Sequence, residues 1–316
     1  MTYAPCEKPT LHFIGVTTGQ SSIMKVFPAW AEHLGLGDVA IRGIDFEPHS
    51  APEAYVEAVQ FIRDDPLSRG ALVTTHKIDL FDAAEELFDE VDVFARLMRE
   101  TSCISKRDNR LVCHAKDPLS SGLAIDGFLG DGYWTGNGAE VFSMGVGGST
   151  IALTWHLMRR ERGQDVPARI VVSDTTQERL DEIRHVHEQI ESDVPVDYVL
   201  VNTPDANDKV LTNMASGSLV INATGLGKDR PGSPLTDAAV FPQNATVWEL
   251  NYRGELVFLD QARAQQAERG LTINDGWTYF IHGWTQVIAE VFDITIDTGK
   301  KNIDKLTDIA VQAAEG

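Results

Sequence analysis

Apolar residues in the first part of the chain occur in two alternating patterns, which are short continuous runs and stretches with a period near 3.6 residues. The continuous runs are typical of buried strands, and the periodic stretches are typical of helices with one apolar face. Strands are expected at residues 11–16, 39–46, 70–75, 101–105 and 110–113. Helices are expected at residues 25–36, 52–64, 81–90 and 91–98. This alternation predicts an α/β domain with an open and largely parallel sheet.

The second part of the chain repeats the alternation after a polar segment, residues 114–126, that is expected to be a connection. Strands are expected at residues 141–144, 168–172, 196–201, 218–221 and 246–250. Helices are expected from residue 151 onward and at 177–192 and 261–269. The amphipathic segment 276–292 is expected to return the chain to the first domain, where residues 302–313 form a terminal helix.

A glycine-rich turn stands between the strand at 141–144 and the helix that follows it. Gly145, Gly147, Gly148 and Ser149 are expected to bind the cofactor, since the turn lets the backbone approach a pyrophosphate and the N-terminus of the following helix presents free N–H groups to it. The next strand ends at Asp174, whose carboxylate can accept hydrogen bonds from the adenosine ribose. This context predicts NAD or NADP binding. A plain glycine loop, with Asp174 as a capping acid for the next helix, is the alternative.

Composition and charge narrow the class of protein. At 316 residues the chain is expected to form about two domains, and 43% hydrophobic residues are typical of a globular protein. The net charge of −20 argues against nucleic acid and against anionic membrane surfaces as partners. A small molecule is therefore the expected partner.

The cysteines and the N-terminus bear on the compartment. Cys6, Cys103 and Cys113 are odd in number and lack metal-ligand spacing, which favours reduced thiols in the cytoplasm. Neither a signal peptide nor an apolar stretch long enough to span a membrane is evident. No metal site is expected, since His185 and His187 lie on opposite sides of a charged helix that is predicted to be solvated.

Several motifs follow one another along most of the chain: TTGQSSIM, LVTTHK, GLAID, GVGGST, INATGLG, ELNY and GWTYFIHGWTQ. In this order they resemble the motifs of the shikimate and quinate dehydrogenase family. The resemblance implies an N-terminal open α/β substrate domain, residues 1–126 with 276–316, and a Rossmann-type dinucleotide-binding domain, residues 127–275. The helical C-terminus then returns to the first domain.

The resemblance also implies roles for particular residues. Lys77 and Asp126 stand where the family has its catalytic lysine and aspartate. The INAT motif would contribute Asn222, Ala223 and Thr224 to the cofactor site. The positions implied for substrate binding are Ser21, Thr74, Ser102, Tyr252 and Gln286.

The chain departs from the family pattern mainly at the substrate positions. The lysine motif lacks the family's proline and is one residue short, so either Val73 or Thr74 can take the place of the substrate-binding threonine. Ser102 stands where an asparagine is expected, and Gln286 lies about one turn from the position of the family's glutamine, which is Gly283 here. We therefore expect a small cyclic hydroxy acid of similar shape rather than shikimate itself.

The residue types fit hydride transfer between a nicotinamide and an alcohol carbon. A lysine can donate a proton to the forming alkoxide and accept it again, and a neighbouring carboxylate would hold that lysine in place. Only the resemblance implies that Lys77 and Asp126 meet. The alternatives are a solvated Lys77, a helix-capping Asp126 and a core Tyr252.

The expected cofactor is NAD rather than NADP. Thr175 stands where NADP-using relatives have an arginine for the 2′-phosphate, and Asp174 would repel that phosphate. The predicted function is thus an NAD-dependent dehydrogenase. Two alternatives stay open, a reductase with an unrelated substrate on the same scaffold and a non-catalytic NAD-binding sensor, although a sensor needs neither Lys77 nor Asp126. A homodimer is compatible with the sequence, which does not establish it.

Overall fold

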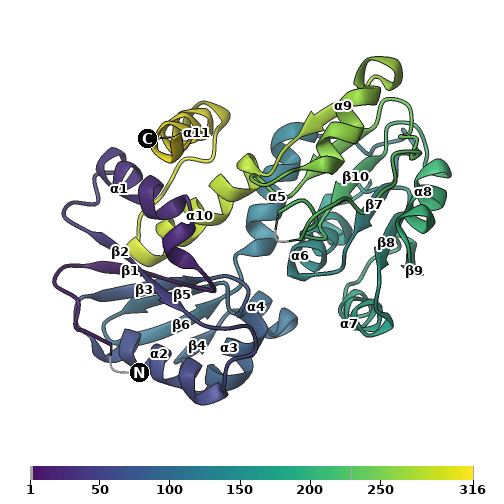
Figure 1. Ribbon diagram of the computed structural model, residues 1–316. Helices are drawn as coiled ribbons and strands as arrows, with labels where there is room; N and C mark the ends of the chain where they lie inside the picture. Colours follow the sequence, from purple (N-terminus) through teal and green to yellow (C-terminus); the bar gives the residue numbers. More distant parts are fainter. Residues whose placement is uncertain (1–2, 229, 316) are drawn as a thin grey trace. The chain divides into compact units, whose positions relative to one another are not determined.

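The computed structural model describes residues 3–228 and 230–315, and the chain divides into two compact units (Figure 1). Unit 1 comprises Met1–Lys116 and Ile281–Gly316, and unit 2 comprises Asp117–Phe280. The domain limits expected from the sequence are 1–126 with 276–316, and 127–275. The first observed boundary comes earlier because the helix that begins at Asp117 packs inside unit 2, and the second comes later, between Phe280 and Ile281.

Unit 1 contains a six-stranded sheet in the order β2-β1-β3-β5-β6-β4. Its strands are β1 (Thr10–Gly15), β2 (Ala40–Asp45), β3 (Ser68–Val73), β4 (Glu90–Val91), β5 (Cys103–Arg107) and β6 (Arg110–His114). β1 pairs in parallel with β2 and β3, whereas β5 pairs antiparallel with β3 and β6. Asp108 and Asn109 join β5 to β6 with φ values of 49° and 63°, as a tight hairpin turn requires. The sheet is therefore mixed, and the parallel prediction holds for its first half.

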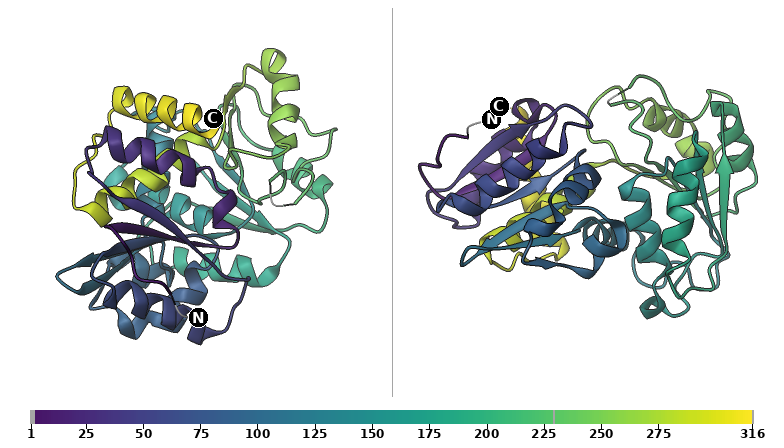
Figure 2. Two further views of the ribbon diagram at one scale, coloured as in Figure 1. Left: turned by 60° about the vertical axis from the view of Figure 1, so that its left-hand side comes forward. Right: turned by 90° about the horizontal axis from the view of Figure 1, so that it is seen from below.

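Helices cover this sheet and include the C-terminal one. The helices of unit 1 are α1 (Ile23–His33), α2 (Pro52–Asp64), α3 (Lys77–Ala84), α4 (Val93–Met98) and α11 (Lys300–Glu315), together with most of α10 (Trp277–Phe292). α1 and α11 lie side by side (Figures 1 and 2), and the Trp30 indole donates a hydrogen bond to the Leu306 carbonyl at 2.9 Å. The predicted helical return of the C-terminus to the first domain is confirmed.

Unit 2 contains a six-stranded sheet that is parallel throughout, in the order β12-β11-β10-β7-β8-β9. Its strands are β7 (Val141–Met144), β8 (Ile170–Asp174), β9 (Val196–Leu200), β10 (Leu219–Asn222), β11 (Thr246–Glu249) and β12 (Thr272–Asn274). The chain order along the sheet reverses at β7, from which one half runs toward β9 and the other toward β12. This is the strand order of the Rossmann fold, so the predicted α/β fold class is confirmed.

Alternating residues of these strands bury two opposite faces of the sheet. Val141 of β7 and Val172 of β8 belong to one apolar cluster, and Phe142 and Val171 belong to another. The first cluster is covered by α5 (Asp117–Leu129), α6 (Gly148–Met158) and α7 (Gln177–His187), and the second by α8 (Pro204–Thr212) and α9 (Val257–Arg269). Helices on both faces make unit 2 a doubly wound layer structure (Figure 2).

The predicted connection at 114–126 is wrong, because most of it forms α5. Its small side chains signal close packing instead of a loop: a Cβ at Gly122 would lie 2.3 Å from the His156 ring on α6. Pro118 at the start of a helix also fits its fixed backbone angle. The helix expected at 81–90 is displaced, since α3 begins at Lys77 and ends at Ala84. α8, β4 and β12 were not predicted.

The helix at 177–192 was predicted to place His185 and His187 in solvent, and this prediction is wrong for His187. His187 is only 5% exposed and lies 2.7 Å from the Thr154 hydroxyl and 2.8 Å from the Tyr198 hydroxyl. Burial lowers the pKa of His187 to about 4, so the ring is neutral.

Within the described residues no helix is long and apolar enough to cross a bilayer.

The contact between α1 and α11 gives a stability prediction. Leu306 is fully buried, so Leu306→Ala is expected to lower the free energy of unfolding by about 2–5 kcal/mol through lost burial and a cavity. Urea denaturation measures this change. Lys305→Ala on the exposed side of the same helix is the control and should stay close to the wild type. Equal stability of the two variants would contradict a packed C-terminal helix.

Candidate functional site

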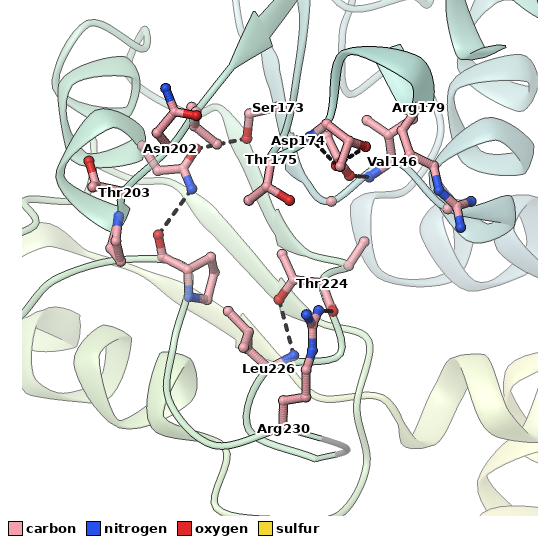
Figure 3. Close-up of a pocket in the computed structure, with 18 residues that line it drawn as sticks. Val146, Ser173, Asp174, Thr175, Arg179, Asn202, Thr203, Thr224, Leu226 and Arg230 are labelled. Atoms are coloured by element: carbon pink, nitrogen blue, oxygen red, sulfur yellow. Dashed lines mark hydrogen bonds between the residues drawn. The ribbon is translucent and has the colours of Figure 1, made fainter. Parts of the chain in front are cut away.

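A pocket of about 540 Å³ opens at the carboxyl ends of the unit 2 strands, where the strand order reverses (Figure 3). Open α/β sheets bind ligands at this place because the loops from adjacent strands diverge there. The structure brings together here five of the residues predicted to bind a cofactor, namely Gly145, Gly147, Asp174, Ala223 and Thr224. Gly148 and Ser149 follow at once as the first residues of α6.

Position 145 requires glycine because another part of the protein backbone lies close to it. Its φ of +90° is unfavourable for other residues, and a Cβ on it would lie 2.7 Å from the Ala223 carbonyl oxygen. Gly147 differs, because a Cβ there would meet no described atom within 4 Å apart from its chain neighbours. The space beside Gly147 and the N-terminus of α6 therefore suit the close approach of a phosphate group.

Thr150 replaces the third glycine of the usual fingerprint and makes its own contacts. Its hydroxyl donates to the Gly145 carbonyl at 2.6 Å and lies 3.0 Å from the Ser143 hydroxyl. The side chain thus ties α6 to the turn and to β7. A residue larger than glycine is tolerated here because its polar group is satisfied.

Asp174 joins the end of β8 to the glycine turn. Its carboxylate accepts hydrogen bonds from the backbone N–H of Val146 at 2.9 Å and of Thr176 at 3.0 Å. The Thr176 hydroxyl adds a third, at 3.1 Å. Asp174 therefore braces the loop before α7 and also lines the pocket, so both roles expected for it are compatible with the structure.

Two arginines in the pocket were missed at the sequence level (Figure 3). Arg179 lies in the first turn of α7. Arg230 lies in the loop after β10 and donates to the Thr224 carbonyl at 3.1 Å. The position of Arg179 could have been recognised, since the first turn of a helix that follows a parallel strand starts at the ligand-binding edge of the sheet. The two guanidinium groups add positive charge to the pocket that the Asp174 carboxylate also lines.

Lys77 is the first residue of α3, and the turn at residues 74–76 joins it to the end of β3 at Val73. Thr75 before it has a φ of +64°, an unusual conformation for a β-branched residue. His76 is buried, and its Nδ1 lies 3.0 Å from the Tyr55 hydroxyl. The turn that presents Lys77 is therefore strained and supported from within unit 1.

The residues predicted to bind substrate are divided between the units. Ser21, Thr74, Ser102 and Gln286 belong to unit 1. The Ser102 hydroxyl already accepts a hydrogen bond from the Lys116 backbone N–H at 2.6 Å. Tyr252 belongs to unit 2, where its ring packs on Trp277 and Phe280. Their roles in substrate binding stay predictions.

Asp126 lies within α5 in a cluster of charged side chains. Arg162 Nη1 donates to Asp126 Oδ1 at 3.0 Å, and His156 Nε2 lies 3.0 Å from Asp126 Oδ2. Burial favours a higher pKa for the Asp126 carboxyl, but these contacts with His156 and Arg162 outweigh it and lower the pKa. The cluster joins α5 to α6. Lys77 belongs to the other unit, so the pairing of Lys77 with Asp126 stays a prediction.

A second aspartate, at the start of α5, was not singled out at the sequence level. Asp117 Oδ2 lies 3.5 Å from the Tyr279 hydroxyl, which in turn lies 3.1 Å from Ser149 Oγ. Ser149 is in the first turn of α6, after the glycine turn. Asp117 is thus connected to the predicted cofactor residues, whereas Asp126 contacts His156 and Arg162. The signal in the sequence was the Asp-Pro pair, which is typical of a helix start.

No family model matches the chain, and no curated protein matches its sequence. Solved structures do match it. A shikimate dehydrogenase in complex with NADP+ has a TM-score of 0.72 at 16% identity, over 97% of this chain and 96% of that one. The quinate dehydrogenase of Corynebacterium glutamicum in complex with NAD has a TM-score of 0.69 at 20% identity, over 96% and 99%. The chain has the shikimate dehydrogenase fold.

The resemblance suggested by the sequence motifs is thereby confirmed as a likeness in fold. A 5-ketofructose reductase of a Gluconobacter strain matches nearly as well, with a TM-score of 0.68 at 16% identity over 96% of this chain and 98% of that one. The shikimate dehydrogenase fold therefore includes structures named for different substrates. The part of the chain that the structure describes contains no group of three or more side chains suited to a metal ion.

The two glycines of the turn give opposite predictions. Gly145→Ala is expected to lower the free energy of unfolding by more than about 1–2 kcal/mol, since strained backbone and the clash with Ala223 add. Gly147→Ala should leave stability within about 0.5 kcal/mol of the wild type and weaken dinucleotide binding. Urea denaturation and a binding titration separate the two effects.

Gly136→Ala is the matched control for backbone strain. Gly136 has a φ of +71°, and a Cβ there would meet no described atom within 4 Å. The difference between Gly145→Ala and Gly136→Ala then measures the close approach of the Ala223 backbone. If the two variants lose the same stability, that contact is not what requires glycine at position 145.

Proposed function

We propose that the protein is an oxidoreductase that transfers a hydride between a nicotinamide dinucleotide and the secondary alcohol or ketone of a small cyclic hydroxy acid. The observation that carries the proposal is the turn at Gly145 and Gly147, which opens onto a pocket at the switch point of a Rossmann sheet. NAD(P), when bound there, supplies or accepts the hydride. Gly147, Ser149 and the N-terminus of α6 would hold the phosphates, and Asp174 would contact the adenosine ribose.

Lys77 is proposed as the acid and base of the reaction. An ammonium group can donate a proton to the forming alkoxide and take it back from the alcohol in the reverse direction. Its place at the first residue of α3, after a strained turn, supports a functional role, because strain of this kind is often retained at active sites. The same positive charge would stabilise negative charge that develops on the substrate oxygen.

The carboxylate that assists Lys77 is proposed to be one of two aspartates of α5. The sequence motif favours Asp126, and the contacts of the side chains favour Asp117. Asp126 is bound to Arg162 and His156 and joins two helices. Asp117 stands at the start of α5 and is linked through Tyr279 to Ser149 at the glycine turn. We therefore favour Asp117, with Asp126 as a structural residue.

The substrate class follows from residues that differ from the family pattern. Ser102 replaces an asparagine, and its hydroxyl is already engaged by the Lys116 backbone. The likeness in fold to a 5-ketofructose reductase also supports testing polyols and keto sugars beside cyclic hydroxy acids. An NAD-binding sensor without turnover is the alternative that such a panel would reveal.

Replacement of Lys77 should remove catalysis and leave cofactor binding intact. Lys77→Ala is expected to lower kcat by about 10²–10⁴-fold, the usual contribution of a positioned acid or base. The Kd for NAD should change little, because the residues that line the pocket belong to unit 2. Reduction of NAD with cyclic hydroxy acids and polyols, and oxidation of NADH with keto sugars, measure the activity of wild type and variant.

The two aspartate variants test the choice between Asp117 and Asp126. Asp117→Asn should lower kcat while the protein stays folded, and Asp126→Asn should lower the melting temperature because His156 and Arg162 lose their carboxylate. A stable Asp126→Asn protein with a large loss of kcat would instead support Asp126. Wild-type turnover by Lys77→Ala would exclude the proposed mechanism.

The preference between NAD and NADP depends on opposing charges in the pocket. Asp174 disfavours a 2′-phosphate, and Arg179 favours one, but the Asp174 carboxylate lies directly at the end of β8. We therefore expect tighter binding of NAD. Arg179→Ala should weaken NADP binding by about tenfold or more and NAD binding much less, as for one lost charged hydrogen bond.

Titration of wild type and variant with both dinucleotides tests the expected preference. Arg184→Ala is the control, because Arg184 lies on the same helix and packs over the Tyr198 ring. A wild-type protein that binds NADP more tightly than NAD would contradict the assignment of NAD. Equal effects of the two arginine variants would show that Arg179 does not contact the cofactor.

A further inference from the structure

A glutamate that none of the proposed steps uses lies fully buried behind the pocket. Glu249 is the last residue of β11 and is 0% exposed. Its Oε2 accepts a hydrogen bond from Asn222 Nδ2 at 2.6 Å, and its Oε1 accepts one from the Asn251 backbone N–H at 2.8 Å. A buried carboxylate is unfavourable unless its contacts compensate, so the presence of Glu249 at this position suggests that its hydrogen bonds have a function.

Hydrogen bonds connect this carboxylate to the wall of the pocket. Asn222 Oδ1 accepts from the Thr224 backbone N–H at 3.1 Å and from its hydroxyl at 2.7 Å. The Thr224 hydroxyl accepts from the Leu226 N–H at 3.1 Å (Figure 3). The Asn222 and Asn251 amides both donate to the Leu226 carbonyl, at 3.4 and 3.2 Å. Thr224 and Leu226 line the pocket, so the chain of contacts runs from Glu249 to the ligand site.

The orientation of the Asn222 amide is the key step in this chain. An asparagine side chain presents an acceptor on one side and a donor on the other, whereas an ionised carboxylate only accepts. Glu249 therefore holds the Asn222 amide with its NH₂ group toward the carboxylate and its oxygen toward Thr224. With the amide turned over, its NH₂ group would face the Thr224 N–H, and two donors would oppose each other.

We propose that ionised Glu249 is a positioning residue that shapes the Thr224–Leu226 wall of the pocket, so that dinucleotide affinity depends on the charge of this one carboxylate. The inference rests on the proposed function for the identity of the ligand. The shape of the wall itself depends only on contacts within unit 2.

In this arrangement the dinucleotide affinity is expected to change with pH near neutrality, where Glu249 ionises. Burial raises the pKa of Glu249 to about 7, although the hydrogen bonds from Asn251 and Asn222 favour the ionised form. The positive charge of Lys228, on the loop after β10, also favours ionisation of Glu249. Asn222 and Asn251 carry no charge. Glu249 therefore takes up a proton as the pH falls through about 7, and the Asn222 orientation weakens.

The experiment has two readouts on the full chain. NAD is titrated between pH 6 and pH 8, and hydrogen exchange of the 223–227 amides is followed in the protein without cofactor, corrected for the intrinsic pH dependence. The wild type should bind NAD about tenfold more tightly at pH 8 than at pH 6, with a parallel gain of protection at Thr224 and Leu226. Glu249→Gln, which cannot ionise, should bind weakly at both pH values and show no pH-dependent protection.

Two further variants serve as controls. Glu249→Asp keeps the charge and should keep a pH dependence, in both readouts, in the wild-type direction. Glu140→Gln replaces a partly buried glutamate of unit 2 that also accepts two hydrogen bonds, from Arg169 and the Ala215 N–H, but lies outside the pocket. It should follow the wild type. If Glu249→Gln does not fold, the wild type and Glu249→Asp profiles carry the test.

The outcomes separate this inference from the proposed function. A wild type that binds NAD equally at both pH values and shows constant protection of Thr224 would overturn the role of Glu249, and so would wild-type behaviour of Glu249→Gln. A wild type that binds neither dinucleotide would overturn the proposed function. In that case the exchange data still decide whether Glu249 positions the wall.

Discussion

The architecture of unit 2 depends on the close approach of two backbone turns at the carboxyl edge of its sheet. β7 and β10 are parallel neighbours, and both chains leave the sheet at the same level. The Ala223 carbonyl therefore comes so near to Gly145 that no side chain fits between them. Because that contact fixes the path of both turns, the space beside Gly147 opens into the pocket, and Asp174 can bind the N–H of Val146.

At the same edge of the sheet, the stability of the fold favours the protonated form of Glu249, whereas the proposed orientation of Asn222 needs the ionised form. The ordinary pKa of a glutamate is 4.5, and that of Glu249 is about 7 in the folded protein. Between these values the folded chain binds more protons than the unfolded chain, so the free energy of unfolding falls as the pH rises through this window. The charged form of Glu249 that orients Asn222 is thus the form that the fold tolerates less well. Conflicts of this kind are expected where a structure is organised for function.

Sequence patterns predicted the helices and strands that their own residues determine. They failed for elements that depend on packing against distant parts of the chain. α2 was predicted with its observed bounds because an apolar face begins at Pro52 and ends before a polar turn. α5 was missed because Ser120, Ser121 and Gly122 are typical of loops, yet all three are buried, and Gly122 packs on the His156 ring of α6. Asp174 was found from its place at a strand end. Glu249 was not, since its role depends on Asn222, a residue 27 positions earlier in the chain.

The proposed sites of the two units differ in the chemical groups they use, which are backbone N–H groups in unit 2 and side chains in unit 1. Phosphate binding by a glycine turn uses backbone N–H groups, so it survives wide divergence of side chains, and the fold is recognisable at 16–20% identity. Substrate recognition uses side chains, and those can change while the fold remains. In unit 1 the Ser102 hydroxyl accepts a hydrogen bond from the backbone of Lys116, so it already stabilises the turn between β6 and α5. A residue engaged in this way is constrained by the fold, and we infer that substrate specificity depends more on side chains at the strand ends that do not also hold a turn in place.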